Sequence, residues 1–585
     1  MSSANGDDRL GRPAQHDAPV ATSIPPGAQA RDQPAPDRLR LILGWVAAIG
    51  IVASVAVMVA VSLAGPSLSV VTMPRPAAGP PWWIWLHPSA ARLTFALWAA
   101  VAAGGIGVIA ALMAVTRGAR PSVRALAALA VIVVGLLTVL PAAGSTDILD
   151  YAANGRMAAT GHSPYVTTPL QLKQSGDPIG RWIPATWETS VSVYGPVATA
   201  EEWAAAELGG TSMARITFWL KLWNSIAFGV VVLLLDRTLR SDPARRLRGH
   251  LLWTVNPLLL WEIVASGHID GLAAAFGLLG ILLLRTGTGS PDGQLGGQLA
   301  ARLVQRPALS RFLLAGLCIG VAAAIKIPYA AFGLGVLWAG LAGTSGVEPA
   351  GADRTVPGGL GRAALGRAAL GGLGQAVRQS VVPLAAAAAG FLLVLAPVYA
   401  VAGRPAVSVL VSRGPATTWD TMYQIFYRPF GYTAFGAFLV PPHLTAIAAV
   451  AFLAVAILAF LRFPDGTPQL PALSPALALS LAWLLVWSYQ RPWYDVMAIC
   501  LLAVYPASRL DWLVLGRLIL TAPVYLPGVP GPIPVWVNDT INVVGEVVSP
   551  WARLLAAVGF IALCVGGWWG WRDRAPGQGA PRALI

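Results

Sequence analysis

Two acidic residues stand where a long apolar run gives way to a polar stretch. Asp147 and Asp150 follow the apolar residues 125–143 and lie in Ser145–Tyr165, which reads STDILDYAANGRMAATGHSPY. An apolar run of this length can cross a bilayer, so we expect both carboxylates where a membrane helix meets water. Their spacing of three places them on one face of a helix, and Arg156 follows two turns later. Carboxylates at a membrane surface, beside an arginine and aromatic residues, suit chemistry on a lipid-borne polar substrate.

The composition is that of an integral membrane protein. Of the 585 residues, 56% are hydrophobic and only 11% are charged, and the mean hydropathy is +0.65. A soluble domain has roughly 25% charged residues, so an ordinary soluble fold is excluded. The net charge of +14 does not indicate nucleic-acid binding. The arginines lie in short segments between apolar runs, not on one basic face with interleaved aromatic residues.

The apolar pattern predicts an all-α, polytopic membrane protein. A bilayer core needs roughly 20 apolar residues per helix, and on that measure the chain has about fourteen crossings. We expect a disordered cytoplasmic tail over 1–38, a transmembrane domain over 39–572 and a short cytoplasmic tail over 573–585. The expected crossings are 41–64, 93–115, 125–143, 215–235, 250–266, 271–285, 311–325, 329–343, 380–402, 443–461, 471–488, 494–508, 511–526 and 551–571.

The placement of arginine sets the expected orientation. Segments on the side of the N-terminal tail carry more arginines, and such an excess marks the cytoplasmic side. We therefore expect a multi-pass plasma-membrane protein with both termini in the cytoplasm. Residues 144–214 and 403–442 then form two extracytoplasmic loops. The stretch Thr199–Leu208 in the first loop has amphipathic character, which predicts an interfacial helix along the membrane surface.

Further ionisable residues gather at the outer ends of the expected crossings. They lie in the turn between the fifth and sixth crossings, at the end of the seventh, and between the eleventh and twelfth: Glu262, His268, Asp270, Lys326 and Arg491. An ionisable group there costs a few kcal/mol unless it is paired or hydrated, which favours a functional role. Structural roles stay open. His268 and Asp270 could cap a hairpin, and Lys326 could extend to the interface with its stem in hydrocarbon.

Asp147 and Asp150 have structural alternatives too. Asp147 could be an ordinary acid at the interface, and Asp150 could be a structural partner of Arg156. The three cysteines, Cys318, Cys500 and Cys564, lie inside apolar runs at unrelated spacings. They show no metal or disulfide pattern and are expected to be small buried side chains.

Four stretches share a pattern with a known family. The first runs from Asp147 to Tyr165 as D-x-x-x-Y-A-A-x-G-R-M-x-A-x-G-x-x-P-Y. The others are Val193-Tyr-Gly-Pro196, Asn256-Pro-Leu-Leu-Leu-Trp-Glu262 with Gly267-His-Ile-Asp270, and Ala323-Ala-Ile-Lys326-Ile-Pro328. Together they resemble the GT-C glycosyltransferases, and more narrowly the actinobacterial polyprenol-phosphomannose-dependent α-1,6-mannosyltransferases. The likeness covers roughly residues 125–345 and, more faintly, Pro492-Trp-Tyr494, with Ile269 where the relatives usually carry Asn.

The resemblance implies a GT-C-like bundle in which a polyprenyl-phosphate-linked sugar is the donor and a glycan or glycolipid is the acceptor, on the outer side of the membrane. Asp147, with Asp150 beside it, would deprotonate the acceptor hydroxyl, an effect typically worth about 10²–10⁴-fold in rate. A single displacement would invert the anomeric centre, in α-1,6-mannan or lipomannan-type cell-envelope assembly. The substrate-binding residues expected from this likeness are Arg156, Tyr165, Tyr194, His268, Asp270, Lys326, Arg428 and Arg491.

The expected partners are thus the lipid-linked donor, the acceptor and membrane lipids, without nucleic acid. No cofactor is required by this scheme. A divalent cation could be coordinated by Asp147, Asp150, His268 and Asp270, but a monophosphate donor has cationic side chains nearby without one.

Two other classes of protein have many membrane helices. A transporter or flippase of lipid-linked sugars would more naturally show an inverted repeat and charges inside interrupted helices. The sequence shows no convincing repeat between its halves, and its polar groups lie at the outer ends of the crossings. A structural protein of the envelope would explain the helices, but not the clustering of acids and isolated cations.

Overall fold

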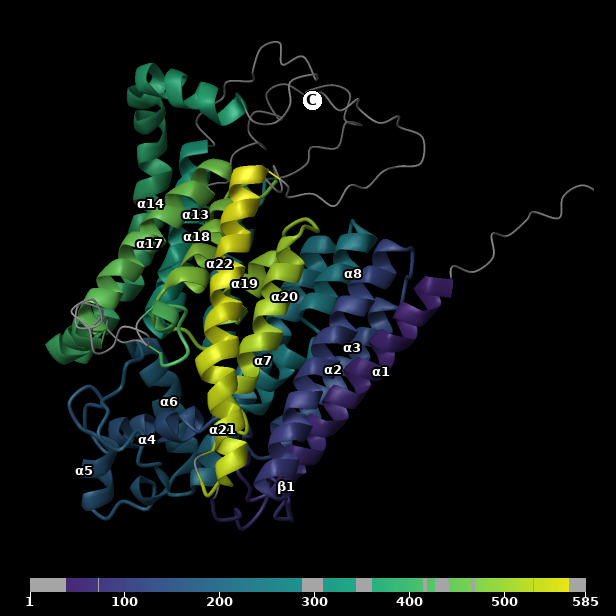
Figure 1. Cartoon of the computed structure of the whole chain (residues 1–585). Coiled ribbons are helices and arrows are strands. Elements are labelled where there is room, and N and C mark those ends of the chain that lie inside the picture. The colour runs from purple at the N-terminus through teal and green to yellow at the C-terminus, as the bar shows by residue number, and fades with distance from the viewer. Residues whose placement is uncertain are drawn as a thin grey trace, which may run out of the picture.

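In a computed structural model the chain forms a bundle of α-helices (Figure 1). The structure describes residues 38–71, 73–286, 309–342, 360–413, 418–426, 441–464, 469–529 and 531–567. The strands assigned within these residues are only β1 (Ala64–Gly65) and β2 (Ile84–Trp85), which pair in parallel. The described chain is thus mostly helical and has almost no strand, as the apolar pattern predicts. The predicted tails, apart from Arg38, lie outside the described residues, and so does Arg428.

Six of the described helices or helix runs are long and apolar enough to cross a membrane. They are α1 (Arg38–Leu63), α2 (Ala90–Thr116), α7 (Met213–Leu239), part of α14 (Leu360–Arg413), part of α17 (Pro441–Arg462), and the run of α21 (Val535–Val543), η6 (Val544–Val548) and α22 (Ser549–Gly566). A seventh span results if α9 (Pro257–Leu259) and η2 (Leu260–Ala265) are joined to α10 (Asp270–Leu283) across a 112° bend.

The other predicted crossings fall on shorter helices. These are α3 (Val123–Val139), α8 (Pro243–Leu252), α12 (Leu309–Ile325), η3 (Ile327–Ala330), α13 (Ala331–Ala342), α18 (Leu473–Val486), η4 (Pro492–Tyr494), α19 (Asp495–Leu502), α20 (Leu510–Thr521) and η5 (Ala522–Tyr525). Because a 17-residue helix rises only about 25 Å, length alone does not establish these as full crossings. The count of fourteen stays a prediction.

Close backbone contact holds neighbouring long helices together. A Cβ atom on Gly50 in α1 would lie 2.5 Å from the backbone oxygen of Ala103 in α2, so only glycine allows this approach. A glycine also allows close contact between α12 and α14, because a Cβ on Gly316 would lie 2.0 Å from the backbone oxygen of Ala387. Small residues at such contacts are typical of helices that associate in a membrane.

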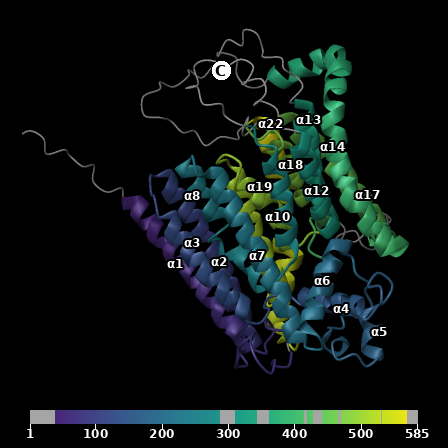
Figure 2. The ribbon, with the colours of Figure 1, turned by 180° about the vertical axis from the view of Figure 1, so that it is seen from behind.

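The segment predicted as the first outer loop is largely helical. It holds α4 (Asp147–Ala159), α5 (Pro169–Gln174), η1 (Gly180–Trp182) and α6 (Pro196–Gly209). Both views place α4, α5 and α6 together at one end of the bundle, opposite the start of α1 and the end of α22 (Figures 1 and 2). Helix α6 contains the predicted stretch Thr199–Leu208, but its acids point inward: Glu201 and Glu202 are buried, whereas Trp203 and Leu208 are exposed.

The chain between α3 and α4 is fastened to the core by a lysine. Lys221 of α7 is fully buried, and its Nζ donates to the backbone oxygens of Leu137 at 2.6 Å, Leu140 at 2.7 Å and Pro141 at 3.1 Å. These carbonyls belong to the unsatisfied end of a helix, which favours a nearby cation. Lys221 therefore fixes the point from which α4 starts.

Candidate active site

Asp147 is the first residue of α4 and is buried, with 8% of its surface exposed. Its backbone N–H donates to Ser145 Oγ at 3.1 Å. Burial raises the pKa of the Asp147 carboxyl, while the charges of Arg491 and Lys326 act to lower it. The carboxyl is thus partly desolvated and lies within the electrostatic reach of two cations that are distant in the sequence.

His268 lies in the break between η2 and α10 and faces Asp147. Its Nε2 is 3.7 Å from Asp147 Oδ2, and its Nδ1 is 2.7 Å from the backbone oxygen of Glu262. The imidazole stacks on the indole of Trp493, with 3.9 Å between ring centroids and 13° between planes. The break is possible because Gly267 adopts a φ of +76°, which favours glycine. Ser266 ties it to the start of α4 by donating to the Ala143 oxygen at 2.8 Å.

Lys326 follows α12 and pairs with Asp270, the first residue of α10. Its Nζ lies 3.0 Å from Oδ1 and 2.8 Å from Oδ2 of that carboxylate, and both residues are buried. The ammonium also lies 3.8 Å from the centroid of the Tyr494 ring. The charge of Lys326 is therefore already balanced by Asp270. Lys326 attracts a substrate anion less strongly than its position in the sequence suggests.

Arg491 precedes η4 and lies among aromatic rings. Its Cζ is 4.7 Å from the ring centroid of Tyr525, 5.3 Å from that of Tyr489 and 5.9 Å from that of Trp493. Within the part of the chain that the structure describes, no carboxylate lies within ion-pair distance of its guanidinium. Among the described residues the charge of Arg491 thus has no ion-pair partner, and it acts on the carboxyl of Asp147.

The stretch Tyr194-Gly195 joins the outer helices to the Lys326 turn. Gly195 donates its N–H to the Ile325 oxygen at 3.0 Å, and a Cβ there would lie 2.0 Å from the Ala324 oxygen. Tyr194 donates to the hydroxyl of Tyr151 at 3.3 Å, and the two rings meet edge to face at 5.0 Å. Because this contact needs glycine, the Y-G-P element places Tyr194 and α6 against the site.

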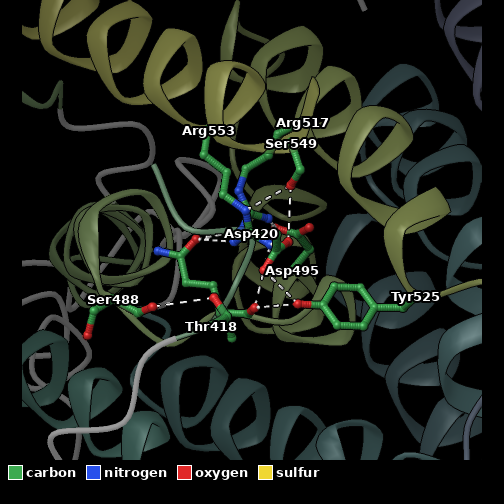
Figure 3. A network of polar contacts seen from close by, with 9 residues as sticks. Thr418, Asp420, Ser488, Asp495, Arg517, Tyr525, Ser549 and Arg553 are labelled. Carbon is green, nitrogen blue, oxygen red and sulfur yellow. Dashed lines mark hydrogen bonds and ion pairs between the residues drawn. The ribbon is translucent and has the colours of Figure 1, made fainter. Parts of the chain in front are cut away.

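A buried polar network holds the turn that carries Arg491 and Trp493 (Figure 3). Gln490 Oε1 accepts from Arg517 at 2.9 Å and from Arg553 at 2.8 Å. Asp420 accepts from Arg553 at 2.5 Å, from Tyr525 at 2.8 Å and from Ser549 at 3.1 Å, while Arg517 pairs with Asp495. The network therefore fixes both ends of the turn and also Tyr525, against which Arg491 lies. Sequence reasoning missed Asp420, Arg517 and Arg553, although a buried ionisable residue in an apolar segment is itself a signal.

Other predicted site residues have local partners instead. Arg156 does not pair with Asp150. Its Nε donates to Asp177 at 2.8 Å, which corrects the structural alternative raised for Asp150. Tyr165 shares a hydrogen bond of 2.8 Å with Thr199, and so ties the end of the Ser145–Tyr165 stretch to α6. Within the described residues, neither side chain hydrogen-bonds or pairs with Asp147, His268, Lys326 or Arg491.

Asp150 belongs to a second group of acids behind the first. Asn154 donates to it at 3.4 Å, and Asn224 of α7 donates to Glu201 at 3.4 Å. Burial, with a smaller contribution from the charge of Asp147, raises the pKa of Asp150 to about 8. Burial likewise raises the pKa of Glu201 to about 8 and that of Glu202 well above its ordinary value. Burial thus favours the protonated form of each of these carboxyls.

The acids do not form a metal site by their geometry. Across the described residues, no three His, Cys, Asp or Glu side chains are grouped so that they could hold a metal ion. The four residues considered for a divalent cation divide instead into the Asp147–His268 contact, the Asp270–Lys326 pair and the Asp150 group.

The fold and the site define a helical membrane protein in which a buried acid, a histidine and two cations meet at one end of the bundle. A family model described as Alpha-(1->6)-mannopyranosyltransferase, N-terminal domain, matches residues 47–342, just over half of the chain. The chain belongs to this family, which confirms the resemblance seen in the motifs.

A curated relative lies in the same family. Over 188 residues the chain is 29% identical to Alpha-(1->6)-mannopyranosyltransferase B of Corynebacterium glutamicum. The matched stretch covers 31% of this chain and 29% of that relative, so it spans less than a third of either protein. No solved structure matches the chain.

Proposed function

We propose that the protein is an inverting glycosyltransferase. It moves a sugar, for which mannose is the first candidate, from a polyprenyl-phosphate donor to a hydroxyl of a glycan or glycolipid acceptor. The transfer takes place at the outer side of the plasma membrane, in α-1,6-mannan or lipomannan-type envelope assembly. The bundle would be GT-C-like with about fourteen crossings, both termini in the cytoplasm and α4–α6 outside.

The observation that carries this proposal is that the charge of Arg491, which has no ion-pair partner among the described residues, acts on the carboxyl of Asp147. The acceptor hydroxyl is a poor nucleophile until a positioned carboxylate takes its proton. The leaving phosphate gains charge as the anomeric bond breaks, and a cation in a partly desolvated site stabilises that charge strongly. Asp147 would be the base, and Arg491 would hold the phosphate.

The remaining residues would support these two groups. The Lys326–Asp270 pair has no net charge but is polar. The N–H groups of the Lys326 ammonium can turn toward a phosphate oxygen. Tyr194 offers a ring of the kind on which sugars and prenyl chains pack, whereas the rings of Trp493 and Tyr494 already contact His268 and Lys326. A single displacement without a covalent intermediate inverts the anomeric carbon, so a β-linked donor gives an α-linked product.

The test is a transfer assay with the purified full chain in lipid nanodiscs. The donors are a panel of polyprenyl-phosphate sugars, the acceptor is a short α-mannoside, and the product is analysed for linkage and anomeric configuration. We expect transfer from polyprenyl-phosphate mannose and an α-1,6 product. A folded protein that accepts no lipid-linked sugar, or that retains the donor configuration, would refute the proposal.

A further inference from the structure

The tautomer of His268 is set by its own backbone. Nδ1 lies 2.7 Å from the carbonyl oxygen of Glu262. Because a carbonyl oxygen only accepts hydrogen bonds, Nδ1 must carry a proton and donate it. In the neutral ring Nε2 is then a bare acceptor.

Among the residues that the structure describes, that acceptor has no hydrogen-bond partner. The His268 side chain is completely buried, and its Nε2 makes no hydrogen bond. It faces Asp147 Oδ2 at 3.7 Å, which is too long for a hydrogen bond. An ionised carboxylate is also an acceptor, so two lone-pair atoms confront each other with no hydrogen between them. A buried acceptor in this state is costly, and a single proton placed between the two atoms would satisfy both.

The ring is not free to turn away. It stacks face to face on Trp493 at 3.9 Å, and rotation would also break the bond to the Glu262 oxygen. Trp493 is itself fixed by its edge-to-face contact with Tyr525, at 5.8 Å between centroids. Nε2 is therefore held toward Asp147 by the hydrogen bond of Nδ1 to the Glu262 oxygen and by the stacking of the ring on Trp493.

We infer that Asp147 and His268 together hold the proton that is taken from the acceptor hydroxyl. This inference rests on the proposed function. In the step, the acceptor oxygen bonds to the anomeric carbon, and the bond from that carbon to the phosphate oxygen breaks with its electron pair going to the phosphate. The hydroxyl proton moves to Asp147 Oδ2. The protonated carboxyl then donates to His268 Nε2, closing the gap by roughly 0.5–1 Å to hydrogen-bond length.

His268 is in this sense a positioning residue, because it acts on the acceptor only through Asp147. A phosphate is a poor ligand for the same atom, since phosphate oxygens are acceptors and Nε2 carries no hydrogen. The titratable groups that surround the pair, one or more from each neighbouring element, are Asp150 on α4, Glu262 on η2, Asp270 on α10, Lys326 after α12 and Arg491 before η4.

The inference is tested with two variants of the full-length protein in nanodiscs. His268→Asn keeps a donor close to the Nδ1 position but has no atom at Nε2, whereas His268→Gln can bring an amide oxygen near the Nε2 position. We expect His268→Asn to lower kcat by roughly 10- to 100-fold, the loss of one hydrogen bond to a charged or reacting group. The KM for the polyprenyl-phosphate donor should change less than threefold, and His268→Gln should recover part of kcat.

The pH profile separates this role from a merely structural one. Asp147 must be ionised to act as base, so kcat/KM rises with pH through its pKa. The bond from protonated Asp147 to Nε2 stabilises the protonated form and raises that pKa. In His268→Asn the acid limb should therefore move to lower pH by roughly half a unit or more.

Three results would overturn the inference: an unchanged kcat in His268→Asn, a loss that appears only in the donor KM, or a fall in kcat with no shift of the acid limb. Thermal unfolding is recorded for both variants. If His268→Asn does not fold, kcat and the pH profile of His268→Gln alone are compared with those of the wild type. Asp147→Asn separates the two proposals. If it retains turnover, the proposed function fails, whereas an inactive Asp147→Asn beside an unchanged His268→Asn defeats only this inference.

Discussion

Arg491 provides the sharpest test of how the leaving phosphate is held. Arg491→Gln removes a guanidinium that lies among three aromatic rings and has no carboxylate within ion-pair distance in the described chain. A hydrogen bond to a charged group contributes about 1.5–3 kcal/mol. Arginine binds phosphate through two such bonds. Allowing for incomplete additivity, we expect a loss of about 2–4 kcal/mol, or roughly 30- to 900-fold in kcat/KM for the lipid donor.

The assay varies the polyprenyl-phosphate sugar at a fixed acceptor concentration and records initial rates. Arg491→Lys keeps the charge but loses the planar fork, so it should fall between wild type and Arg491→Gln. Arg181→Gln is the matched control, because its guanidinium also lies over an indole, 5.2 Å from the Trp182 centroid, but outside the site. If Arg491→Gln stays within threefold of this control, or if only the acceptor KM rises, Arg491 does not hold the phosphate.

Three further predictions address the neighbouring elements. Lys326→Met leaves Asp270 buried without its cation, which should destabilise the fold by about 3–5 kcal/mol. Adding Asp270→Asn should restore the unfolding temperature but not donor use, and full recovery of transfer would make the pair purely structural. Asp420→Asn removes the charge that faces Arg553, so it should lower both the unfolding temperature and kcat, with the acceptor KM unchanged. A normal kcat would show that the network does not position the turn that carries Arg491. A cysteine at the exposed Ser175 should be labelled by an impermeant maleimide from outside intact cells, whereas protection there would reverse the topology.

The helices were largely predictable because burial in lipid requires apolar runs. Each predicted crossing contains a helix in the described structure, although several are far shorter than a bilayer. The direction of α6 was not predictable from its pattern. Glu201 and Glu202 face inward against α4 and α7, where Asn154 and Asn224 lie, while Trp203 faces out. A helix whose acidic side meets buried asparagines of its neighbours reverses the usual amphipathic expectation.

Most of the candidate site that the sequence predicted lies in the N-terminal part, with Arg428 and Arg491 as the exceptions. The motifs that contain Asp147, His268 and Lys326 all lie inside the matched residues 47–342, and the structure brings these three together. Their pairings were not visible in the sequence, because they depend on how hairpins dock. Lys326 meets Asp270 rather than open solvent, and Arg156 turns to Asp177.

The C-terminal half supplies groups that the sequence marks only faintly, as with Arg491 and Trp493, or not at all, as with Arg517 and Arg553. Arg491 and Trp493 complete the site, and the Asp420–Arg553–Gln490 network holds them from helices that the family model does not cover. Partners so far apart in the chain leave no local spacing signal. Only the rule that a buried charge needs a partner would have pointed to Arg517 and Arg553.

The most direct measurement is transfer of labelled mannose from polyprenyl-phosphate mannose by wild type and by Asp147→Asn, at equal abundance and equal unfolding temperature. Asparagine keeps the shape of the side chain but cannot take a proton. We expect the rate to fall by about 10²–10⁴-fold, with donor binding retained. Turnover of Asp147→Asn at the wild-type rate would show that Asp147 is not the base and that the reaction does not depend on the site assembled around it.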